Sequence, residues 1–225
     1  MEKLRIKSIQ KNLNTSFIGK KIIYFKELDS TNTFAIKFIR DTKNSKAINM
    51  FDGTVIVAET QTKGKGRFDR MWFSPPGGLW FSIILQPKIE LNDLSKITLL
   101  SAAVLVEILE YDYLSSEHSK DLHIKWPNDI YYKDRKLAGI LAESEKINER
   151  LYLIVGIGLN ANCNIANNLG KNTKAISLKK ILGMQIDRNF LLSKILTAFE
   201  KNYTYFTGTE DFKSIFNKIE RFIIF

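Results

Sequence analysis

Short apolar runs separated by polar turns recur along the chain and predict an alternation of strands and helices. The runs that are rich in β-branched and aromatic residues have the pattern of strands. These strands are expected at 21–28, 53–60, 79–87, 123–145 and 151–162. Pro127 and a polar turn at 133–135 divide the fourth stretch into three shorter strands, the last two of which should form a hairpin.

Apolar residues at helical spacing predict helices between and after the strands. The helices are expected at 31–41, 96–113, 187–206 and 211–222. Ser30, Thr31 and Asn32 are suitable N-cap residues for the first helix. The second is apolar almost all round, so we expect it to lie buried against a sheet. With neither an internal repeat nor a clear linker, the pattern predicts one α+β domain, a mixed β-sheet flanked by helices.

The composition narrows the classes of protein that fit. Of the 225 residues 44% are hydrophobic, which supplies a core and excludes disorder as the main state. Cys163 is the one cysteine, so neither an intramolecular disulfide nor a CxxC zinc site can form. His118 and His123 are the two histidines available as a catalytic base. Since no apolar stretch reaches about 18 residues, we expect a cytoplasmic protein without a membrane partner.

The net charge of +10 comes from 34 Lys and Arg against 24 Asp and Glu. The basic residues are spread along the whole chain, whereas a nucleic-acid-binding protein would cluster them on one face. The densest run, KGKGR at 63–67, contains two glycines. Backbone amides in such a loop can hold an anion, but the spacing equally fits a flexible, solvated basic loop.

Glycines mark three places where something can approach the backbone closely. Seven of the 12 glycines lie within 64–78, at 139 and within 156–158, each beside the end of an apolar strand. The last stretch, GIGLNA, matches a dinucleotide-binding pattern, but no acidic residue follows about twenty positions later and the next segment is a poor helix start. A dinucleotide-binding fold is therefore disfavoured.

Four motifs together resemble those of biotin protein ligases. They are LDSTN at 28–32, GKGRFDRMW at 64–72, KWPNDIYYKDRKLAGIL at 125–141 and GIGLN at 156–160, in the order found in that family. The similarity extends over about residues 21–200. It implies a core of the type that class II aminoacyl-tRNA synthetases and biotin protein ligases share. Residues 1–20 would be an N-terminal extension without a DNA-binding domain, and 21–225 the catalytic domain.

The resemblance also implies a reaction. The enzyme would use ATP and Mg²⁺ to convert biotin into biotinyl-5′-AMP and would then transfer biotin to a lysine of the biotin carboxyl carrier protein of acetyl-CoA carboxylase. No DNA partner is expected, and a homodimer joined at a sheet edge remains open. Arg67 and Lys136 would lie against the acyl phosphate. Asp129 would hold or deprotonate the incoming ammonium group, unless it serves only an Asx turn.

By the same resemblance, hydroxyl and amide side chains at the first helix cap would bind the ureido ring of biotin, and glycines would admit the ligand past a strand end. The implied biotin-binding residues are Ser30, Thr31, Asn32, Gln61, Gly64, Lys65, Arg67, Lys136, Gly139 and Gly156. The implied ATP-binding or adenylate-binding residues are Lys65, Arg67, Arg70, Trp72, Lys136, Gly158 and Asn160. No metal ligands are assigned.

The chain departs from the family pattern at several places. Lys65 stands where arginine is usual, which keeps the charge but loses a bidentate donor. Ala175 stands where relatives often have an aromatic residue that stacks on adenine. We expect neither the winged helix-turn-helix of repressor relatives nor their C-terminal SH3-like domain. Two alternatives stay open: a lipoate ligase or octanoyltransferase, and, in another class, a non-enzymatic basic nucleic-acid-binding module.

Overall fold

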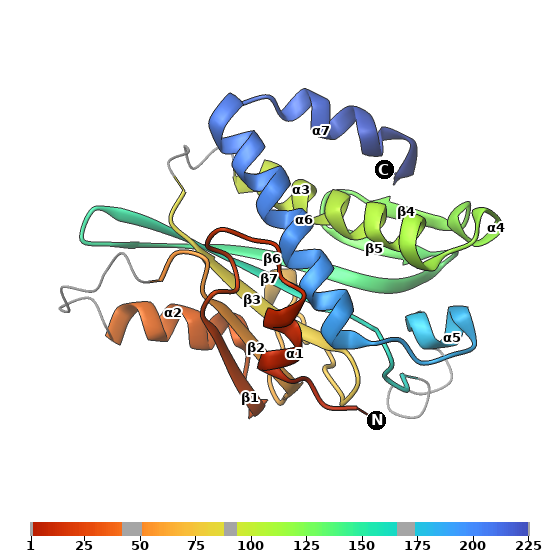
Figure 1. The fold of residues 1–225 in the computed structure, drawn as a ribbon, viewed down its shortest axis with the longest axis horizontal. Helices are drawn as coiled ribbons and strands as arrows, with labels where there is room; N and C mark the ends of the chain where they lie inside the picture. Colours follow the sequence, from red (N-terminus) through yellow and green to blue (C-terminus); the bar gives the residue numbers. More distant parts are fainter. Residues whose placement is uncertain (1, 42–50, 88–93, 166–173, 225) are drawn as a thin grey trace.

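The computed structural model describes residues 2–41, 51–87, 94–165 and 174–224 (Figure 1). Every strand predicted from the sequence is present in these ranges. The strands are β1 (Ile22–Leu28), β2 (Val55–Gln61), β3 (Leu79–Leu85), β4 (Leu122–Lys125), β5 (Asp129–Tyr132), β6 (Arg135–Ile147), β7 (Arg150–Leu159) and β8 (Ile223–Ile224). They form one eight-stranded sheet in the order β1-β2-β3-β7-β6-β5-β4-β8. The β1–β2 and β4–β8 pairs are parallel and the others antiparallel, so the predicted mixed sheet is confirmed.

All four predicted helices are present, and three short ones join them. The helices are α1 (Ile6–Lys11), α2 (Thr31–Asp41), α3 (Leu94–Ile108), α4 (Ser116–Ser119), α5 (Leu178–Leu182), α6 (Arg188–Thr209) and α7 (Phe212–Ile219). A π-helical turn, Leu109–Tyr113, continues α3 to the predicted end. No helix in the described ranges is long and apolar enough to cross a membrane.

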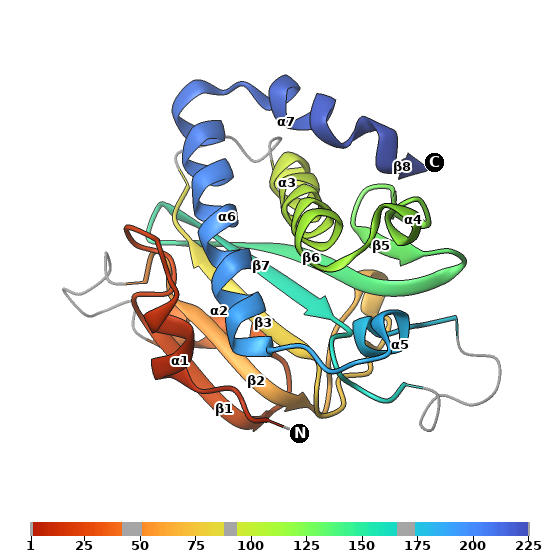
Figure 2. The same cartoon turned by 45° about the vertical axis from the view of Figure 1, so that its right-hand side comes forward.

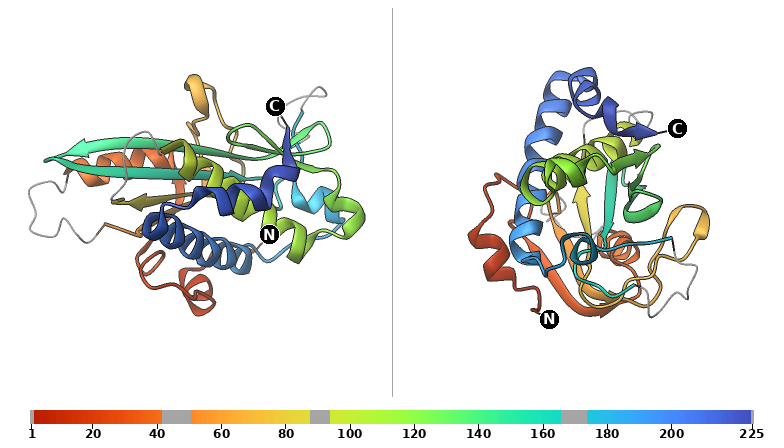
Figure 3. Two further views of the ribbon diagram at one scale, coloured as in Figure 1. Left: turned by 90° about the horizontal axis from the view of Figure 1, so that it is seen from above. Right: turned by 90° about the vertical axis from the view of Figure 1, so that its right-hand side faces the viewer.

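The helices cover the two faces of the sheet unequally. One face carries α3 and α6, with α1 and α7 packed on them, and α2 lies on the other (Figures 2 and 3). The larger apolar core lies between the sheet and the first group of helices. A smaller core, with Ala35 and Ile39 at its centre, lies under α2. Because α2 covers only part of its face, room for a site remains beside its N-terminus.

The sequence pattern did not predict α1, which belongs to the segment before β1. Leu4, Ile9 and Ile18 of this segment are buried, although they are widely spaced in the sequence. The carboxylate of Glu200 on α6 accepts hydrogen bonds from the backbone N–H groups of residues 16–18. Contacts with a distant helix, rather than local periodicity, thus hold the segment.

A buried ion pair joins β2 to the start of α6. Arg188 Nη1 lies 2.9 Å from Glu59 Oε2 and 2.9 Å from the carbonyl oxygen of Gly78. The other oxygen of Glu59 accepts the N–H of Leu4 at 2.6 Å. Burial and the nearby Glu59 carboxylate raise the pKa of Tyr24. Every polar atom of the pair that is named here has a partner, as a buried charge requires.

Replacing one member of this pair tests its contribution. We expect Arg188→Met to lower the free energy of unfolding by about 3–5 kcal/mol, because Glu59 would keep its charge in a buried position without a cation. Urea unfolding measures the change. In Glu59→Gln/Arg188→Met much of the loss should be recovered, and a double variant as unstable as the sum of the two single variants would contradict the coupling.

Candidate active site

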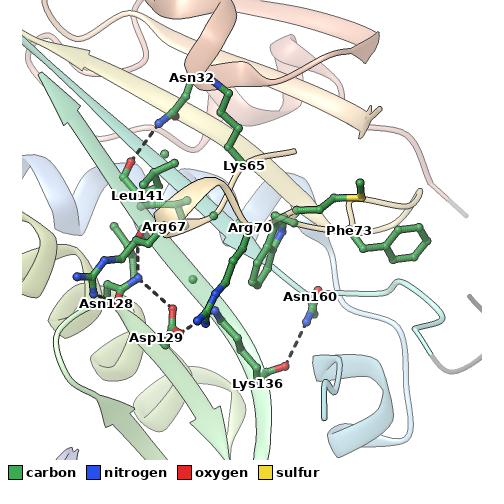
Figure 4. Close-up of a pocket in the computed structure, with 18 of the residues that line it drawn as sticks. Asn32, Lys65, Arg67, Arg70, Phe73, Asn128, Asp129, Lys136, Leu141 and Asn160 are labelled. Atoms are coloured by element: carbon green, nitrogen blue, oxygen red, sulfur yellow. Dashed lines mark hydrogen bonds and ion pairs between the residues drawn. The ribbon is translucent and has the colours of Figure 1, made fainter. Parts of the chain in front are cut away.

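A pocket of about 510 Å³ opens on the α2 face of the sheet (Figure 4). Its walls come from the N-terminus of α2, the loop after β2, the β4–β5 turn and the strands β6 and β7. These segments lie far apart in the sequence and carry the four motifs. The sheet order places β6 and β7 next to each other in its middle, so they form the floor.

The floor depends on glycines that the sheet register brings together. Gly139 of β6 pairs with Gly158 of β7, and two residues along β7 Gly156 pairs with Leu141. On its other side β7 pairs with β3, which places Ser82 beside Gly156. Alternate residues of a strand point to the same face. The three glycines therefore leave three of these four paired positions without side chains on the pocket face, and Leu141 is the fourth.

The side chain of Asn32 occupies the space above Gly156. Asn32 Nδ2 donates to the carbonyl oxygen of Leu141 at 3.1 Å and to Glu143 Oε2 at 2.7 Å, while Asn32 Oδ1 lies 2.6 Å from Ser82 Oγ. A Cβ atom on Gly156 would come within 2.2 Å of Asn32 Oδ1. Asn32 thus lies where a side chain at position 156 would be, while Gly156 also lines the pocket, and its contact with a ligand stays a prediction.

Hydroxyl and amide groups collect at the start of α2. The N–H of Thr31 donates to Gln61 Oε1 at 2.8 Å, and Gln61 Nε2 donates to Ser74 Oγ at 2.8 Å. Ser30 caps the helix, since the N–H of Thr33 reaches its Oγ at 3.4 Å. Ser30 and Thr31 are buried, so this end of the pocket is neutral, polar and fixed in position.

The glycine-rich loop is a short hairpin that stands at the pocket mouth. The N–H of Trp72 donates to the carbonyl oxygen of Gly64 at 2.8 Å, and the N–H of Gly66 donates to that of Arg70 at 2.7 Å. The amide of Gly66 therefore pairs within the loop, unlike the free amides expected of an anion cradle. A Cβ on Gly64 would lie 2.3 Å from the oxygen of Trp72, so the hairpin requires this glycine.

Positive side chains dominate the wall of the pocket. Five cations line it, and Asp129 is the one carboxylate among its described lining residues. The cations are Lys65, Arg67, Arg70, Lys125 and Lys136. Lys65 and Arg70 are exposed, and no side chain in the described ranges forms an ion pair with them. The wall is thus suited to a ligand that carries several negative charges.

Arg67 and Lys136 are the two ends of one hydrogen-bonded network. Arg67 Nη1 donates to Asn128 Oδ1 at 2.9 Å, and Asn128 Nδ2 donates to Asp129 Oδ1 at 3.1 Å. Asp129 Oδ2 lies 2.7 Å from Lys136 Nζ. Burial, followed by the Asp129 charge, raises the pKa of the nearby Tyr131. The three residues predicted to be catalytic lie in this network.

Trp72 lies against the glycine floor beneath Lys136. Its ring centroid is 4.9 Å from Lys136 Nζ, and a Cβ on Gly158 would come within 2.6 Å of its Nε1. That nitrogen is buried and has no hydrogen-bond partner in the described part of the chain. Trp72 and Ala175 both pack against a small apolar cluster of Trp80, Cys163 and Ile165. The other end of the pocket is therefore aromatic and cationic.

Asn160 uses its polar groups mainly within the protein. Its Nδ2 donates to the carbonyl oxygen of Lys136 at 3.3 Å, and its backbone oxygen accepts the N–H of Leu178 at 2.8 Å. It thereby holds the end of β7 against the start of β6. Asn160 still lines the pocket, as its place in the GIGLN motif led us to expect.

Comparison with known proteins identifies the family. Residues 24–160 match the model of the biotin/lipoate A/B protein ligase family. The chain belongs to this family. It is 36% identical over 205 residues to the bifunctional ligase/repressor BirA of Bacillus subtilis, covering 89% of this chain and 59% of that protein. The alignment with Escherichia coli BirA has 29% identity and covers 91% and 61%. The chain thus spans about three fifths of the length of these two relatives.

A solved structure extends the likeness to the fold. The biotin protein ligase of Aquifex aeolicus, in complex with biotin and ATP, has a TM-score of 0.72 and 35% identity. The match covers 91% of this chain and 79% of that one. The α+β fold with a mixed sheet is therefore that of the biotin and lipoate ligases.

The pocket gathers nearly all the site residues that the motifs of the ligase family imply. Gly64 is the exception, since it does not line the pocket and lies against the backbone of Trp72 within the hairpin. Those that line the pocket are Ser30, Thr31, Asn32, Gln61, Lys65, Arg67, Arg70, Trp72, Asp129, Lys136, Gly139, Gly156, Gly158 and Asn160. Their individual roles remain predictions.

Four polar residues at or behind the pocket were not predicted from the sequence. Ser82 and Glu143 fix Asn32, Ser74 fixes Gln61, and Asn128 bridges Arg67 and Asp129. Asn128 lies inside the KWPND motif, so its place in that motif was the available signal. Ser82 lies in the middle of an apolar run, and a polar residue at such a position was the available signal. Glu143 and Ser74 gave no comparable signal.

The contact between Gly156 and Asn32 can be tested by unfolding. We expect Gly156→Ala to lower the free energy of unfolding by about 1–3 kcal/mol, because the new methyl group overlaps Asn32 Oδ1. Gly208→Ala is the matched control, since no atom lies within 4 Å of its added Cβ. The control should be neutral or slightly stabilising in its helix. Equal stability of the two variants would contradict the packing described here.

Proposed function

We propose that this protein is a biotin protein ligase, which activates biotin with ATP to biotinyl-5′-AMP and transfers biotin to a lysine of a biotin carboxyl carrier protein. The observation that carries the proposal is the single pocket in which all four family motifs meet. The sequence and fold match to a ligase whose structure contains biotin and ATP supports it.

The two ends of the pocket suit the two ends of the activated substrate. The neutral donors and acceptors of Ser30, Thr31 and Gln61 suit a ureido ring, which is uncharged and both donates and accepts hydrogen bonds. Arg67 and Lys136 lie at the cationic end, where a carboxylate and a phosphate would meet. Biotin would then lie along the floor between them, beside Gly156 and Gly139.

The first step joins two anions. A carboxylate oxygen of biotin attacks the α-phosphorus of ATP, the bond to the β-phosphate oxygen breaks, and pyrophosphate leaves with the electron pair. Positive groups fixed in place stabilise the charge that builds up on the phosphoryl oxygens. Arg67 and Lys136 supply this charge at the reacting end. Lys65 and Arg70, both exposed, add positive charge to the pocket wall.

The second step needs an uncharged amine. The nitrogen of the acceptor lysine attacks the acyl carbon, the bond to the phosphate oxygen breaks, and AMP leaves. Asp129 is the carboxylate among the described lining residues that can bind the ammonium group and take its proton. In the ligand-free structure Lys136 pairs with this carboxylate at 2.7 Å. When the phosphate draws Lys136 toward itself, Asp129 becomes available to the incoming amine.

Magnesium enters as part of the MgATP substrate. The described residues contain no group of three or more His, Cys, Asp or Glu side chains that could hold a metal ion. A magnesium ion is often held by one or two carboxylates together with the phosphates of its nucleotide. Asp129 is the one carboxylate among the described lining residues, so the phosphates would be the main ligands.

The exchange of labelled pyrophosphate into ATP tests the first step directly. With biotin and MgATP the purified protein should catalyse this exchange, and omission of biotin should abolish it. Parallel reactions with lipoate and octanoate separate the sister activities within the family. Exchange that depends on lipoate instead of biotin would move the protein to the lipoate ligases. Salt-sensitive retention of DNA with no exchange would favour a nucleic-acid-binding module.

A further inference from the structure

The β4–β5 turn places a buried amide at the centre of the catalytic network. Asn128 is 7% exposed, and its side chain makes three hydrogen bonds to protein groups. Its Oδ1 accepts from Arg67, and its Nδ2 donates to Asp129 and, at 3.0 Å, to the carbonyl oxygen of Ile140. The backbone is also tied down, since the oxygen of Asn128 accepts the N–H of Ile140 at 2.9 Å.

These bonds join segments that lie far apart in the sequence, the hairpin after β2, the β4–β5 turn and β6. Arg67 belongs to the hairpin at the mouth, whose neighbouring residues Phe68 and Met71 are each 81% exposed. Asp129 and Ile140 belong to adjacent strands of the sheet. The Arg67–Asn128 bond is thus a polar link that fixes an exposed loop to the rigid floor.

Only an amide of this length can make this set of bonds. Arginine is solely a donor and an ionised carboxylate solely an acceptor, so the group between them must accept on one side and donate on the other. An aspartate at position 128 would still accept from Arg67. It would, however, present a negative oxygen to Asp129 and to the carbonyl of Ile140.

We propose that Asn128 is a positioning residue for both half-reactions, because it holds the Arg67 guanidinium for adenylate formation and the Asp129 carboxylate for transfer to the amine. This inference rests on the proposed ligase function. Biotin recognition should depend little on Asn128, since Ser30, Thr31 and Gln61 lie at the start of α2 and the end of β2 and form no hydrogen bond with it.

Two substitutions separate the two sides of the amide. Asn128→Ala removes every side-chain bond, so kcat should fall by about 10–100-fold in both pyrophosphate exchange and transfer to a carrier protein, with the KM for biotin changed less than about threefold. Asn128→Asp keeps the acceptor for Arg67 and loses the donor to Asp129. It should reduce transfer at least about tenfold more than exchange.

The matched control is another buried asparagine that bonds to backbone groups outside the pocket. Asn162 Nδ2 donates to the carbonyl oxygen of Ile186 at 2.8 Å, and its Oδ1 accepts the N–H of the same residue at 3.0 Å. Asn162→Ala should lower stability yet leave the ratio of transfer to exchange unchanged. Circular dichroism and thermal unfolding of all variants establish which are folded at the assay temperature.

The outcomes are distinguishable. An active wild-type protein, with Asn128→Ala no more impaired than Asn162→Ala or Asn128→Asp equally impaired in both half-reactions, would overturn the positioning role alone. A folded wild-type protein without biotin-dependent exchange would overturn the proposed function and this inference with it. If Asn128→Ala fails to fold, the isosteric Asn128→Asp decides the question by its transfer-to-exchange ratio.

Discussion

The pocket depends on the absence of side chains at adjacent positions of two central strands. Gly139, Gly156 and Gly158 face the same side of β6 and β7, and the register of the sheet places them together. The side chains of Asn32 and Trp72 fill part of this space, and a Cβ on Gly156 or Gly158 would collide with them. The glycines therefore shape the pocket by allowing the side chains of Asn32 and Trp72 to contact the backbone of the sheet directly.

Electrostatics then decides what the pocket can hold. Five cations and one carboxylate line the described walls, and hydrogen bonds and an ion pair hold three of them, Arg67, Asp129 and Lys136, in position. Charges held in place before the reaction need no reorganisation when negative charge develops. The Arg67–Asn128–Asp129–Lys136 network shows how this is done, since a neutral amide holds Arg67 and the Asp129 carboxylate holds Lys136.

The sequence predicted the strands, the long helices and the mixed sheet, because periodicity and caps such as Ser30 are local signals. It did not predict α1 or β8, whose positions depend on distant contacts: Ser193 of α6 donates to the carbonyl oxygen of Ile9, and β8 pairs with β4. The motifs led to most of the pocket, and the structure adds that Gly156 and Gly64 each leave room for protein atoms, those of Asn32 and Trp72. Asn128 was not predicted because its role depends on hydrogen bonds to Arg67, Asp129 and Ile140, and the sequence alone does not show which side chains are hydrogen-bonded to each other.

The central claim is that one pocket makes the adenylate, retains it and delivers it. A single-turnover experiment tests this most directly. The protein is incubated with labelled biotin and MgATP, and gel filtration then removes the unbound nucleotide and biotin. The protein with its bound adenylate is mixed with a biotin carboxyl carrier domain. We expect labelled biotin on the carrier lysine and an equal amount of AMP in solution, without further ATP. Label that stays off the carrier, or transfer that begins only after fresh ATP is added, would contradict the account.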